Sequence, residues 1–209
     1  MTVLTLAEVS KSYRGTQVLR PISFELHPGE LVALTGPSGS GKSTLLMIAG
    51  GWETPDTGTV TPGAPLPAVP MARMPWQHLG FVPQSIGLFE ELTVADNLAF
   101  AARTVDTGAD LAKLLETLDL AKFADRLPTE ISRGEQQRAA VGRALATAPA
   151  LVLADEPTSH QDRTHAEVVL ARLRTAADAG AAVLVASHDP LLAAHTDRTI
   201  ALTGAGAEH

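Results

Sequence analysis

The chain has 209 residues, and its 16 Lys and Arg against 23 Asp and Glu give a formal net charge of −7. A chain of this length folds as one large domain or as a core that carries a sub-domain, and its acidic balance disfavours nucleic acid as a partner. It contains no cysteine, which excludes disulfides, thiolate metal sites and a cysteine nucleophile.

The sequence offers no segment suited to the inside of a membrane. No apolar run approaches the roughly 18 residues that cross a bilayer. Met1–Ser10 lacks the basic region and long apolar stretch of a signal peptide. We therefore expect a cytoplasmic protein, and if it serves a membrane, a different protein must span that membrane.

The N-terminal part predicts strands and one helix. Met1–Val9 and Pro21–Leu26 are short strands on either side of a turn at Arg14–Gly15, which favours an antiparallel pair. Glu30–Leu34 is an apolar strand that leads at once into a run of Gly and Ser. A helix over Thr44–Ala49 follows and stops at two glycines.

The middle of the chain predicts a loop, then a short strand and then helices. Pro55–Pro75 holds six of the fourteen prolines and few charges, which predicts a loop with little regular structure. Leu79–Val82 predicts a short strand. From Ala95 to Thr147 the pattern is helical, with one apolar face made by Leu111, Leu114, Leu115 and Leu118.

The C-terminal part alternates strands with a helix. Leu151–Ala154 and Ala182–Ala186 are continuous apolar runs, typical of parallel strands buried on both faces. The amphipathic stretch Arg163–Ala177 lies between them, and Thr199–Leu202 predicts an edge strand. This order indicates one α/β domain over 1–209 with an N-terminal antiparallel hairpin. Its parallel-sheet core covers about 1–86 and 149–209, and an inserted helical sub-domain covers about 87–148.

A Gly-rich segment between the strand and the helix predicts a phosphate-binding loop. The stretch from Gly36 to Ser43 fits G-x-x-x-x-G-K-S, in which glycines let backbone N–H groups converge on phosphate and the helix adds its dipole. A chance match occurs in roughly one such chain in a hundred, so we favour a nucleoside triphosphate site with the RecA-like core of P-loop NTPases. Its expected contacts are Gly36, Pro37, Ser38, Gly39, Ser40, Gly41, Lys42, Ser43 and Thr44.

A second polar element follows a buried strand. Asp155 and Glu156 come directly after Leu151–Ala154, and buried strands deliver such residues to the ligand crevice. Asp155 is placed to hold Mg²⁺ through water, together with the Ser43 hydroxyl, and Glu156 to orient an attacking water. The alternative, an acidic turn before Pro157, loses weight because the phosphate loop lies upstream.

With these motifs in their order, the chain resembles the ATP-binding-cassette (ABC) ATPases over essentially its whole length. Ile131–Arg138 is similar to the family signature, and Gln84 matches the glutamine-loop position. Ser159–Asp162 is similar to the D-loop, and the segment around His188 to the switch histidine. Tyr13 lies where the family stacks an aromatic ring on adenine.

The resemblance implies a role for each of these residues. Glu156, His188, Lys42 and Gln84 would be catalytic, and Gln84 would join Ser43 and Asp155 around Mg²⁺. Ser132 and Gly134 would contact ATP bound to a second copy of the chain, and Asp162 would touch that copy. Ser132 and Glu135 also form the pattern of a helix capping box. The expected ligands are therefore ATP and Mg²⁺.

The chain departs from the family pattern at the signature and D-loop. Arg133 stands where the family usually has glycine, and Glu135 where glutamine is common, whereas His160 and Gln161 are bulkier than usual. Three segments look closest to the ATPases of lipoprotein-release and macrolide-export systems: Lys11–Arg14, Leu88–Asn97 and Glu135–Arg138. The remaining histidines show no metal-ligand spacing, and we interpret them as surface or structural residues: His27, His78, His160, His165, His195 and His209.

The resemblance implies the ATPase subunit of a transporter, whose ATP-bound dimer drives separate transmembrane permease subunits from the inner face of the membrane. An ABC ATPase of a non-transport membrane machine, such as a cell-wall or division regulator, is the alternative. A soluble repair protein is disfavoured because only 46 residues separate Gln84 from Ile131, too few for a long coiled coil. A P-loop kinase would leave Gln84 and the signature without a role.

Overall fold

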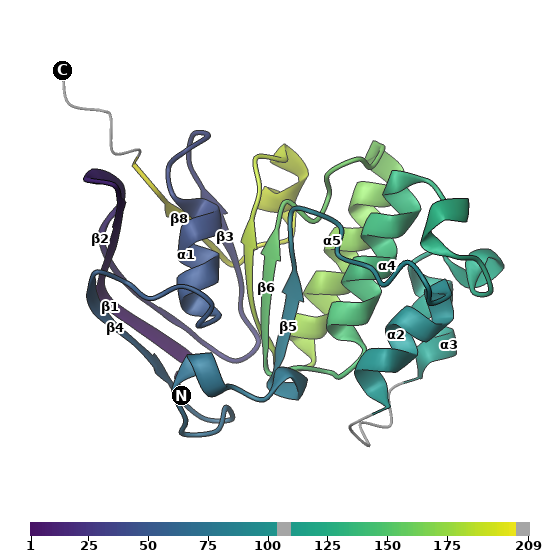
Figure 1. Ribbon diagram of the computed structural model, residues 1–209, viewed down its shortest axis with the longest axis horizontal. Coiled ribbons are helices and arrows are strands. Elements are labelled where there is room, and N and C mark those ends of the chain that lie inside the picture. The colour runs from purple at the N-terminus through teal and green to yellow at the C-terminus, as the bar shows by residue number, and fades with distance from the viewer. Residues whose placement is uncertain (104–109, 204–209) are drawn as a thin grey trace.

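The computed structural model describes residues 1–103 and 110–203 as two sheets with helices packed around them (Figure 1). Part of the predicted helical stretch, 104–109, and His209 lie outside the described residues. The described part contains no helix long and apolar enough to cross a membrane.

The larger sheet is parallel and lies at the centre of the molecule. Its strand order is β5-β6-β7-β3-β8, and all neighbouring pairs are parallel. Its strands are β3 (Leu31–Thr35), β5 (Leu79–Val82), β6 (Leu151–Asp155), β7 (Ala182–Ala186) and β8 (Arg198–Ala201). The predicted strands and the edge position of the last one are confirmed.

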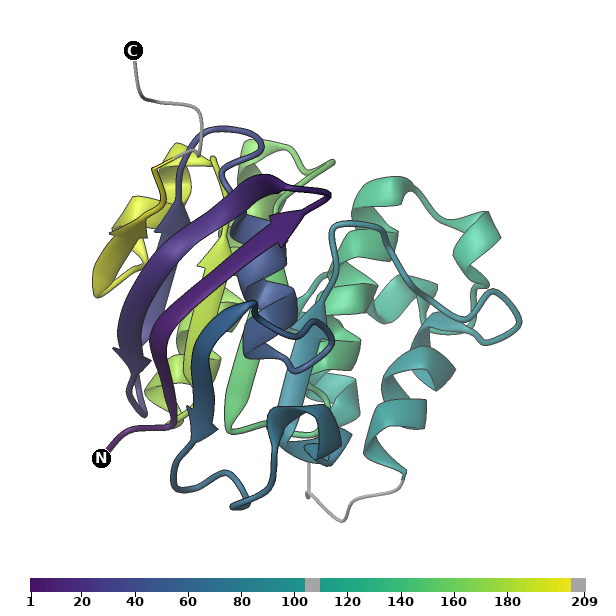
Figure 2. The ribbon, with the colours of Figure 1, turned by 60° about the vertical axis from the view of Figure 1, so that its left-hand side comes forward.

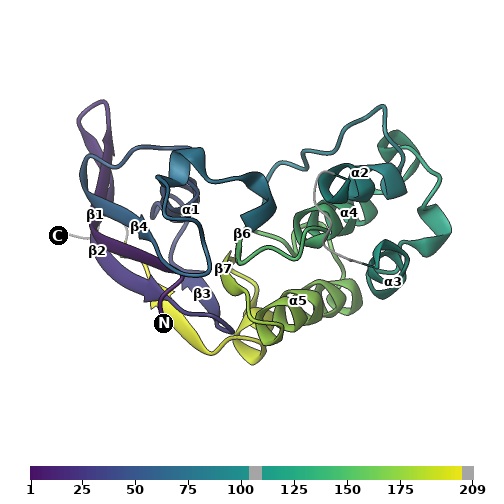
Figure 3. The same cartoon turned by 90° about the horizontal axis from the view of Figure 1, so that it is seen from below.

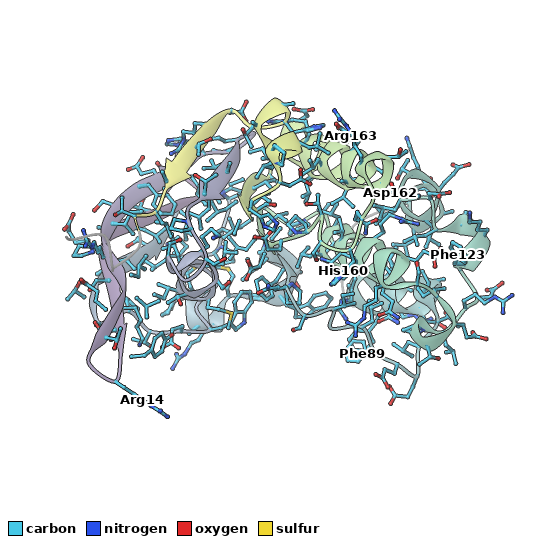
Figure 4. The ribbon with its side chains drawn as sticks, turned by 90° about the horizontal axis from the view of Figure 1, so that it is seen from above. Arg14, Phe89, Phe123, His160, Asp162 and Arg163 are labelled. Atoms are coloured by element: carbon cyan, nitrogen blue, oxygen red, sulfur yellow. The ribbon has the colours of Figure 1, made fainter. Side chains whose placement is uncertain are left out.

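A second, antiparallel sheet stands beside it with the order β2-β1-β4. Its strands are β1 (Leu4–Tyr13), β2 (Thr16–Leu26) and β4 (Thr57–Pro62). The predicted hairpin is confirmed, and both strands run on to a tip marked by Arg14 (Figure 4).

The prediction of an irregular loop over 55–75 was wrong at its start. Thr57–Pro62 pairs with β1, because Thr and Val alternate there and favour an extended backbone. Pro62 ends this edge strand, where the missing N–H costs nothing. Later residues form short 3-10 turns, η1 (Met71–Arg73) and η2 (Trp76–His78).

Helices cover both faces of the parallel sheet (Figures 2 and 3). The helix α1 (Lys42–Ala49) lies between the two sheets. On the other side lie α2 (Val94–Ala102), α3 (Leu111–Thr117), α4 (Arg133–Leu145) and α5 (Arg163–Asp178). Short turns η3 (Ala121–Phe123), η4 (Pro128–Glu130) and η5 (Pro190–Ala194) connect them.

Alternate residues of the buried strands fill two separate cores. Leu31 and Ala33 of β3 face the cluster under α4 and α5, whereas Val32 and Leu34 face the cluster under α1 and the antiparallel sheet. This alternation explains why the strands read as unbroken apolar runs, since both of their faces are buried. It also fixes the register, and with it the place where each strand ends.

Candidate functional site

The site lies at the carboxyl ends of three adjacent parallel strands. β3 leads into the phosphate loop, β6 ends at Asp155, and β7 is followed by Ser187 and His188. Parallel strands bring these ends to one edge of the sheet. Residues that are more than a hundred positions apart in the sequence therefore meet.

Three glycines give the phosphate loop its shape. Gly36, Gly39 and Gly41 have φ values of +148°, +77° and +94°, a region that favours glycine. A Cβ on Gly41 would also lie 2.7 Å from the carbonyl oxygen of Val18, so the loop is seated directly on β2. The backbone conformation of the loop therefore disfavours residues larger than glycine at these positions.

The loop leaves donors available for an anion. No side chain caps the N-terminus of α1, and the buried Ser40 Oγ has no hydrogen-bond partner. Lys42 Nζ donates to the carbonyl oxygens of Gly36 and Pro37 at 2.8 and 3.1 Å. An ammonium held across the loop, together with free N–H groups at a helix start, suits phosphate oxygens.

Asp155 and Ser43 provide oxygen atoms beside that loop. Asp155 is buried, and burial raises the pKa of its carboxyl, while a hydrogen bond from Ser43 opposes this rise. A carboxylate and a hydroxyl are ligands that Mg²⁺ accepts, and Mg²⁺ in phosphate sites uses few protein ligands. Within 1–103 and 110–203, no group of three or more His, Cys, Asp or Glu side chains is arranged to hold a metal ion.

Glu156 points across the edge toward the end of β7. Its backbone is left-handed, with φ +50°, and its N–H donates to Ala186 O at 2.8 Å. Its carboxylate accepts a hydrogen bond from Ser187 Oγ at 3.1 Å and lies 3.0 Å from His188 Nδ1. The contact with Glu156 raises the pKa of the exposed His188.

Two further predicted residues border this edge. Tyr13 is 43% exposed. Its hydroxyl donates to Glu53 Oε2 at 3.1 Å and neighbours Thr44 at the start of α1. Gln84 is exposed directly after β5, the strand next to β6. Tyr13 thus lies beside the start of α1, and Gln84 follows the strand next to the one that ends at Asp155.

The signature and D-loop residues form a second group. Ser132 caps α4 and accepts a hydrogen bond from the Glu135 N–H, and the Glu135 carboxylate accepts one from the Ser132 N–H, so the predicted capping box is confirmed. Asp162 caps α5 and also contacts His165 at 2.9 Å. α4 and α1 lie on opposite sides of β5 and β6 (Figure 1), so the structure does not bring Ser132 and Gly134 to the chain's own phosphate loop.

The sequence patterns missed several residues around these groups. Glu53 holds Tyr13 and forms an ion pair with Lys11 Nζ at 2.8 Å. Gln161 links the D-loop to α4. Beyond them lies an apolar groove of about 380 Å³, whose lining includes Trp76, Phe81, Phe89, Phe100 and Arg143. Gln161 lies in the segment that resembles the D-loop and Phe89 in the 88–97 segment, but their contacts were not predicted. The one available signal for Glu53 was its charge complementarity with Lys11.

Comparisons with known proteins agree with this geometry. Residues 19–159 match the family described as ABC transporter. The chain is 41% identical to the lipoprotein-releasing system ATP-binding protein LolD of Shewanella oneidensis, over 96% of this chain and 93% of that protein. It is 38% identical to the macrolide export ATP-binding/permease protein MacB of Salmonella typhimurium, over 95% of this chain but only 33% of that longer protein.

Solved structures show the same fold. An ATP-binding subunit of an ABC transporter superposes with a TM-score of 0.86 at 27% identity, over 98% of this chain and 87% of that one. A dimeric ATP-binding cassette in a post-hydrolysis state, bound to ADP and Pi, gives 0.84 at 30% identity, over 97% and 95%. The chain therefore belongs to the ABC transporter family, as one of its ATPase cassettes.

Proposed function

We propose that two copies of this chain bind Mg-ATP between them and that hydrolysis drives separate transmembrane subunits. The observation that carries the proposal is the division of the site. The phosphate loop, Asp155, Glu156 and His188 share one edge, whereas Ser132 and Gly134 lie at the start of α4 on the far side of the sheet. A second copy would supply these two residues. The dimeric relative with ADP and Pi supports this arrangement.

In this proposal the site residues bind the phosphates, activate water, hold adenine or contact the partner chain. Lys42 and the backbone N–H groups of 36–44 hold the phosphates and stabilise developing charge. Mg²⁺, held by Ser43, Asp155 and Gln84, partly through water, would neutralise phosphate charge. Glu156 accepts the proton of the attacking water, His188 donates to the γ-phosphate, and Tyr13 stacks on adenine. Asp162 contacts the partner chain.

We further propose that the membrane partner docks beside Gln84. The groove with Phe89 and Phe100 is apolar and exposed, and α2 and α4 of the proposed helical sub-domain at about 87–148 form one of its walls. The chain is similar to LolD and to part of the ATP-binding/permease protein MacB, and we propose that it works with separate permease subunits on the inner face of the membrane. Release of lipoproteins and export of macrolides are the transport classes suggested by the relatives.

The variant Glu156→Gln tests the hydrolysis site. The amide cannot take a proton from water, and loss of a general base lowers turnover by about 100-fold or more. ATP binding should persist, since the phosphate loop is untouched, and ATP should then trap a dimer in size-exclusion chromatography.

Glu25→Gln is a matched control, because Glu25 lies on β2 and is exposed. It should keep wild-type turnover and form no trapped dimer. Near-normal turnover in Glu156→Gln would remove Glu156 from the catalytic role, and a chain that remains monomeric in both variants with ATP would argue against the shared site.

A further inference from the structure

A second cavity lies at the edge of the parallel sheet that is opposite to the phosphate loop. Three of its lining residues stand directly before strands, His78 before β5, Ala150 before β6 and Ala181 before β7. Because parallel strands begin at one edge and end at the other, the sheet separates this cavity from the candidate ATP site (Figure 1). The cavity has a volume of about 480 Å³, which is in the range of small-molecule pockets.

Small and apolar side chains form most of the cavity wall. One face of α5 contributes four residues with the spacing of neighbouring helical turns, namely Arg172, Thr175, Ala176 and Ala179. The other lining residues are Pro65, Leu114, Leu145, Ala148, Pro149 and Gly180. None of the lining residues that the structure describes is Asp or Glu, so the wall offers no carboxylate to an arginine.

Arg172 lines this cavity without a partner of its own. Its side chain is half-buried, and its Nε atom is buried without a hydrogen-bond partner. In the described part of the chain it also forms no ion pair, whereas Arg174 on the same helix pairs with Asp178 and Asp197 at 2.9 and 2.6 Å. A guanidinium keeps its charge and has N–H donors only. Because buried donors are normally satisfied, this side chain indicates a missing acceptor.

His78 adds a second donor to the same cavity. It is half-buried at the end of η2, and its ring makes no hydrogen bond to any other described residue. An imidazole has an N–H to donate in either protonation state. The hydroxyl of Thr175 is already used, since it donates to Ala171 O at 2.8 Å. The side-chain groups left available to a ligand are therefore hydrogen-bond donors.

We propose that this cavity binds a small organic carboxylate with an apolar body. Its carboxylate accepts hydrogen bonds from Arg172 and His78, because a guanidinium matches the two oxygens of a carboxylate. Its apolar body lies against the small side chains of α5 and the segment after α4, where burial of apolar surface stabilises the complex. The inference is independent of the proposed function, since none of these residues belongs to the ATP site.

Octanoate is the probe, titrated into the purified full chain without nucleotide by isothermal titration calorimetry. We expect saturable binding with a Kd below about 1 mM, the affinity of a small ligand with one strong anchor. Two further probes separate the parts of the ligand, because 1-octanol lacks the charge and inorganic phosphate lacks the apolar body. Each should bind at least about tenfold more weakly than octanoate.

Arg172→Met tests the charge of the cavity while it keeps a long apolar stem. The affinity for octanoate should fall by at least about tenfold, because a hydrogen bond to a charged group is lost, and the affinity for 1-octanol should not change. Arg126→Met is the matched control, since Arg126 is exposed, lies outside the cavity lining and pairs with Glu130 at 3.6 Å. It should bind octanoate as the wild type does.

Ala176→Leu tests the place of binding, because the added atoms fill part of the cavity. It should abolish octanoate binding and keep the wild-type melting temperature. If leucine at this half-buried position prevents folding, Ala179→Leu serves the same purpose, since Ala179 is exposed at the end of α5 and also lines the cavity.

Four results would overturn the proposal. The first is no saturable heat with octanoate up to about 10 mM, ten times the highest Kd expected. Equal affinities for 1-octanol and octanoate would exclude recognition of a carboxylate. Wild-type affinity in Arg172→Met, or an equal loss in Arg126→Met, would remove Arg172 from the site. Octanoate binding that persists in a folded Ala176→Leu or Ala179→Leu chain would place the ligand outside this cavity.

Discussion

Tyr13 presents an exposed ring whose hydroxyl is fixed by Glu53. Burial and the nearby Glu53 carboxylate raise the pKa of Tyr13, so the hydroxyl stays a donor. Glu53→Ala should release the ring, and ordering such a side chain again on binding costs about 0.5–1.5 kcal/mol. We predict a KM for ATP that rises by about two- to tenfold at that energy, with kcat retained, in steady-state assays.

Tyr13→Phe provides the comparison, because it keeps the ring and removes only the hydroxyl. It should raise KM by a similar factor, whereas Tyr13→Ala should raise it further by removing the stacking surface. If kcat falls as much as kcat/KM in Glu53→Ala, the residue acts on the chemistry or the fold and not on adenine.

Single residues were predictable from sequence where a short motif contains them. Lys42, Ser43 and Asp155 follow from local spacing, because a strand end and a Gly-rich turn place them. The contacts of Glu53 and Gln161 did not follow, because their partners Tyr13 and Gly134 lie 40 and 27 positions away. Such pairs depend on which strands and helices become neighbours, and local periodicity carries no such information.

The 88–97 segment is held in shape by one buried side chain. Asn97 is fully buried, and its Nδ2 donates to the carbonyl oxygens of Phe89, Leu92 and Thr93 at 3.0–3.1 Å. Leu88 is partly buried and packs on the core. Phe89, Glu90 and Glu91 remain at the surface, and they form the part available to a partner.

Reversing the charges in Glu90→Lys/Glu91→Lys should uncouple hydrolysis from transport. Both side chains are exposed next to the groove, so the isolated chain should keep its basal hydrolysis and melting temperature. Stimulation of hydrolysis by the membrane subunit in reconstituted vesicles should be lost. Equal loss of basal hydrolysis would mean that the segment is structural.

Asn97→Ala separates docking from folding. It should destabilise the chain by about 1–3 kcal/mol, because buried carbonyl oxygens lose their donors, and this is measurable by urea unfolding. If the double Lys variant is stable and Asn97→Ala is unstable, the exposed side chains serve partner docking and the buried Asn97 amide serves folding.

Helices and strands were predictable where the hydrophobic pattern of the segment fits only one type of element. β5 and β7 have the predicted bounds, and α1 begins two residues before its prediction. β4 was missed because six prolines dominate the 55–75 stretch, although its strand signal is the run of β-branched residues before Pro62. Pairing with β1 stabilises the extended backbone there, and this pairing depends on tertiary structure that the local sequence does not show.

The β3–β8 edge of the parallel sheet is tied to α5 by an ionic contact. Asp197 accepts hydrogen bonds from the Leu31 N–H at 2.8 Å and from Arg174 Nη1 at 2.6 Å, and Arg174 also donates to Gly29 O at 2.8 Å. The Leu31 N–H, and then Arg174, lower the pKa of Asp197. The contact joins β3, the approach to β8 and α5.

This lowered pKa fixes the direction of a pH effect. The Asp197 carboxylate contributes stability above its unfolded pKa of about 3.9, and that contribution is lost as the pH falls through the lower folded value. The urea midpoint of the wild type should therefore fall more steeply below about pH 4 than that of Asp197→Asn. Parallel profiles for the two proteins would show that the carboxylate adds no pH-dependent stability.

We predict that the exposed Arg133 affects closure of the proposed dimer. It is the first residue of α4, after the Ser132 cap, so its side chain is free to face a second copy. The cap uses Ser132 and Glu135, and neither needs Arg133. A guanidinium near the partner's γ-phosphate would form strong charge-assisted bonds, whereas a side chain trapped between closing surfaces would hinder them.

Arg133→Gly in the Glu156→Gln background decides between these outcomes. We predict weaker ATP-dependent dimerisation by light scattering, with a defect that shrinks at high salt because screening already weakens the wild-type contact. Without ATP the stability should fall only modestly, by about 0.8 kcal/mol from helix propensity. Tighter dimerisation of the glycine variant would instead show that Arg133 obstructs closure, and that this chain closes against a steric barrier which glycine removes.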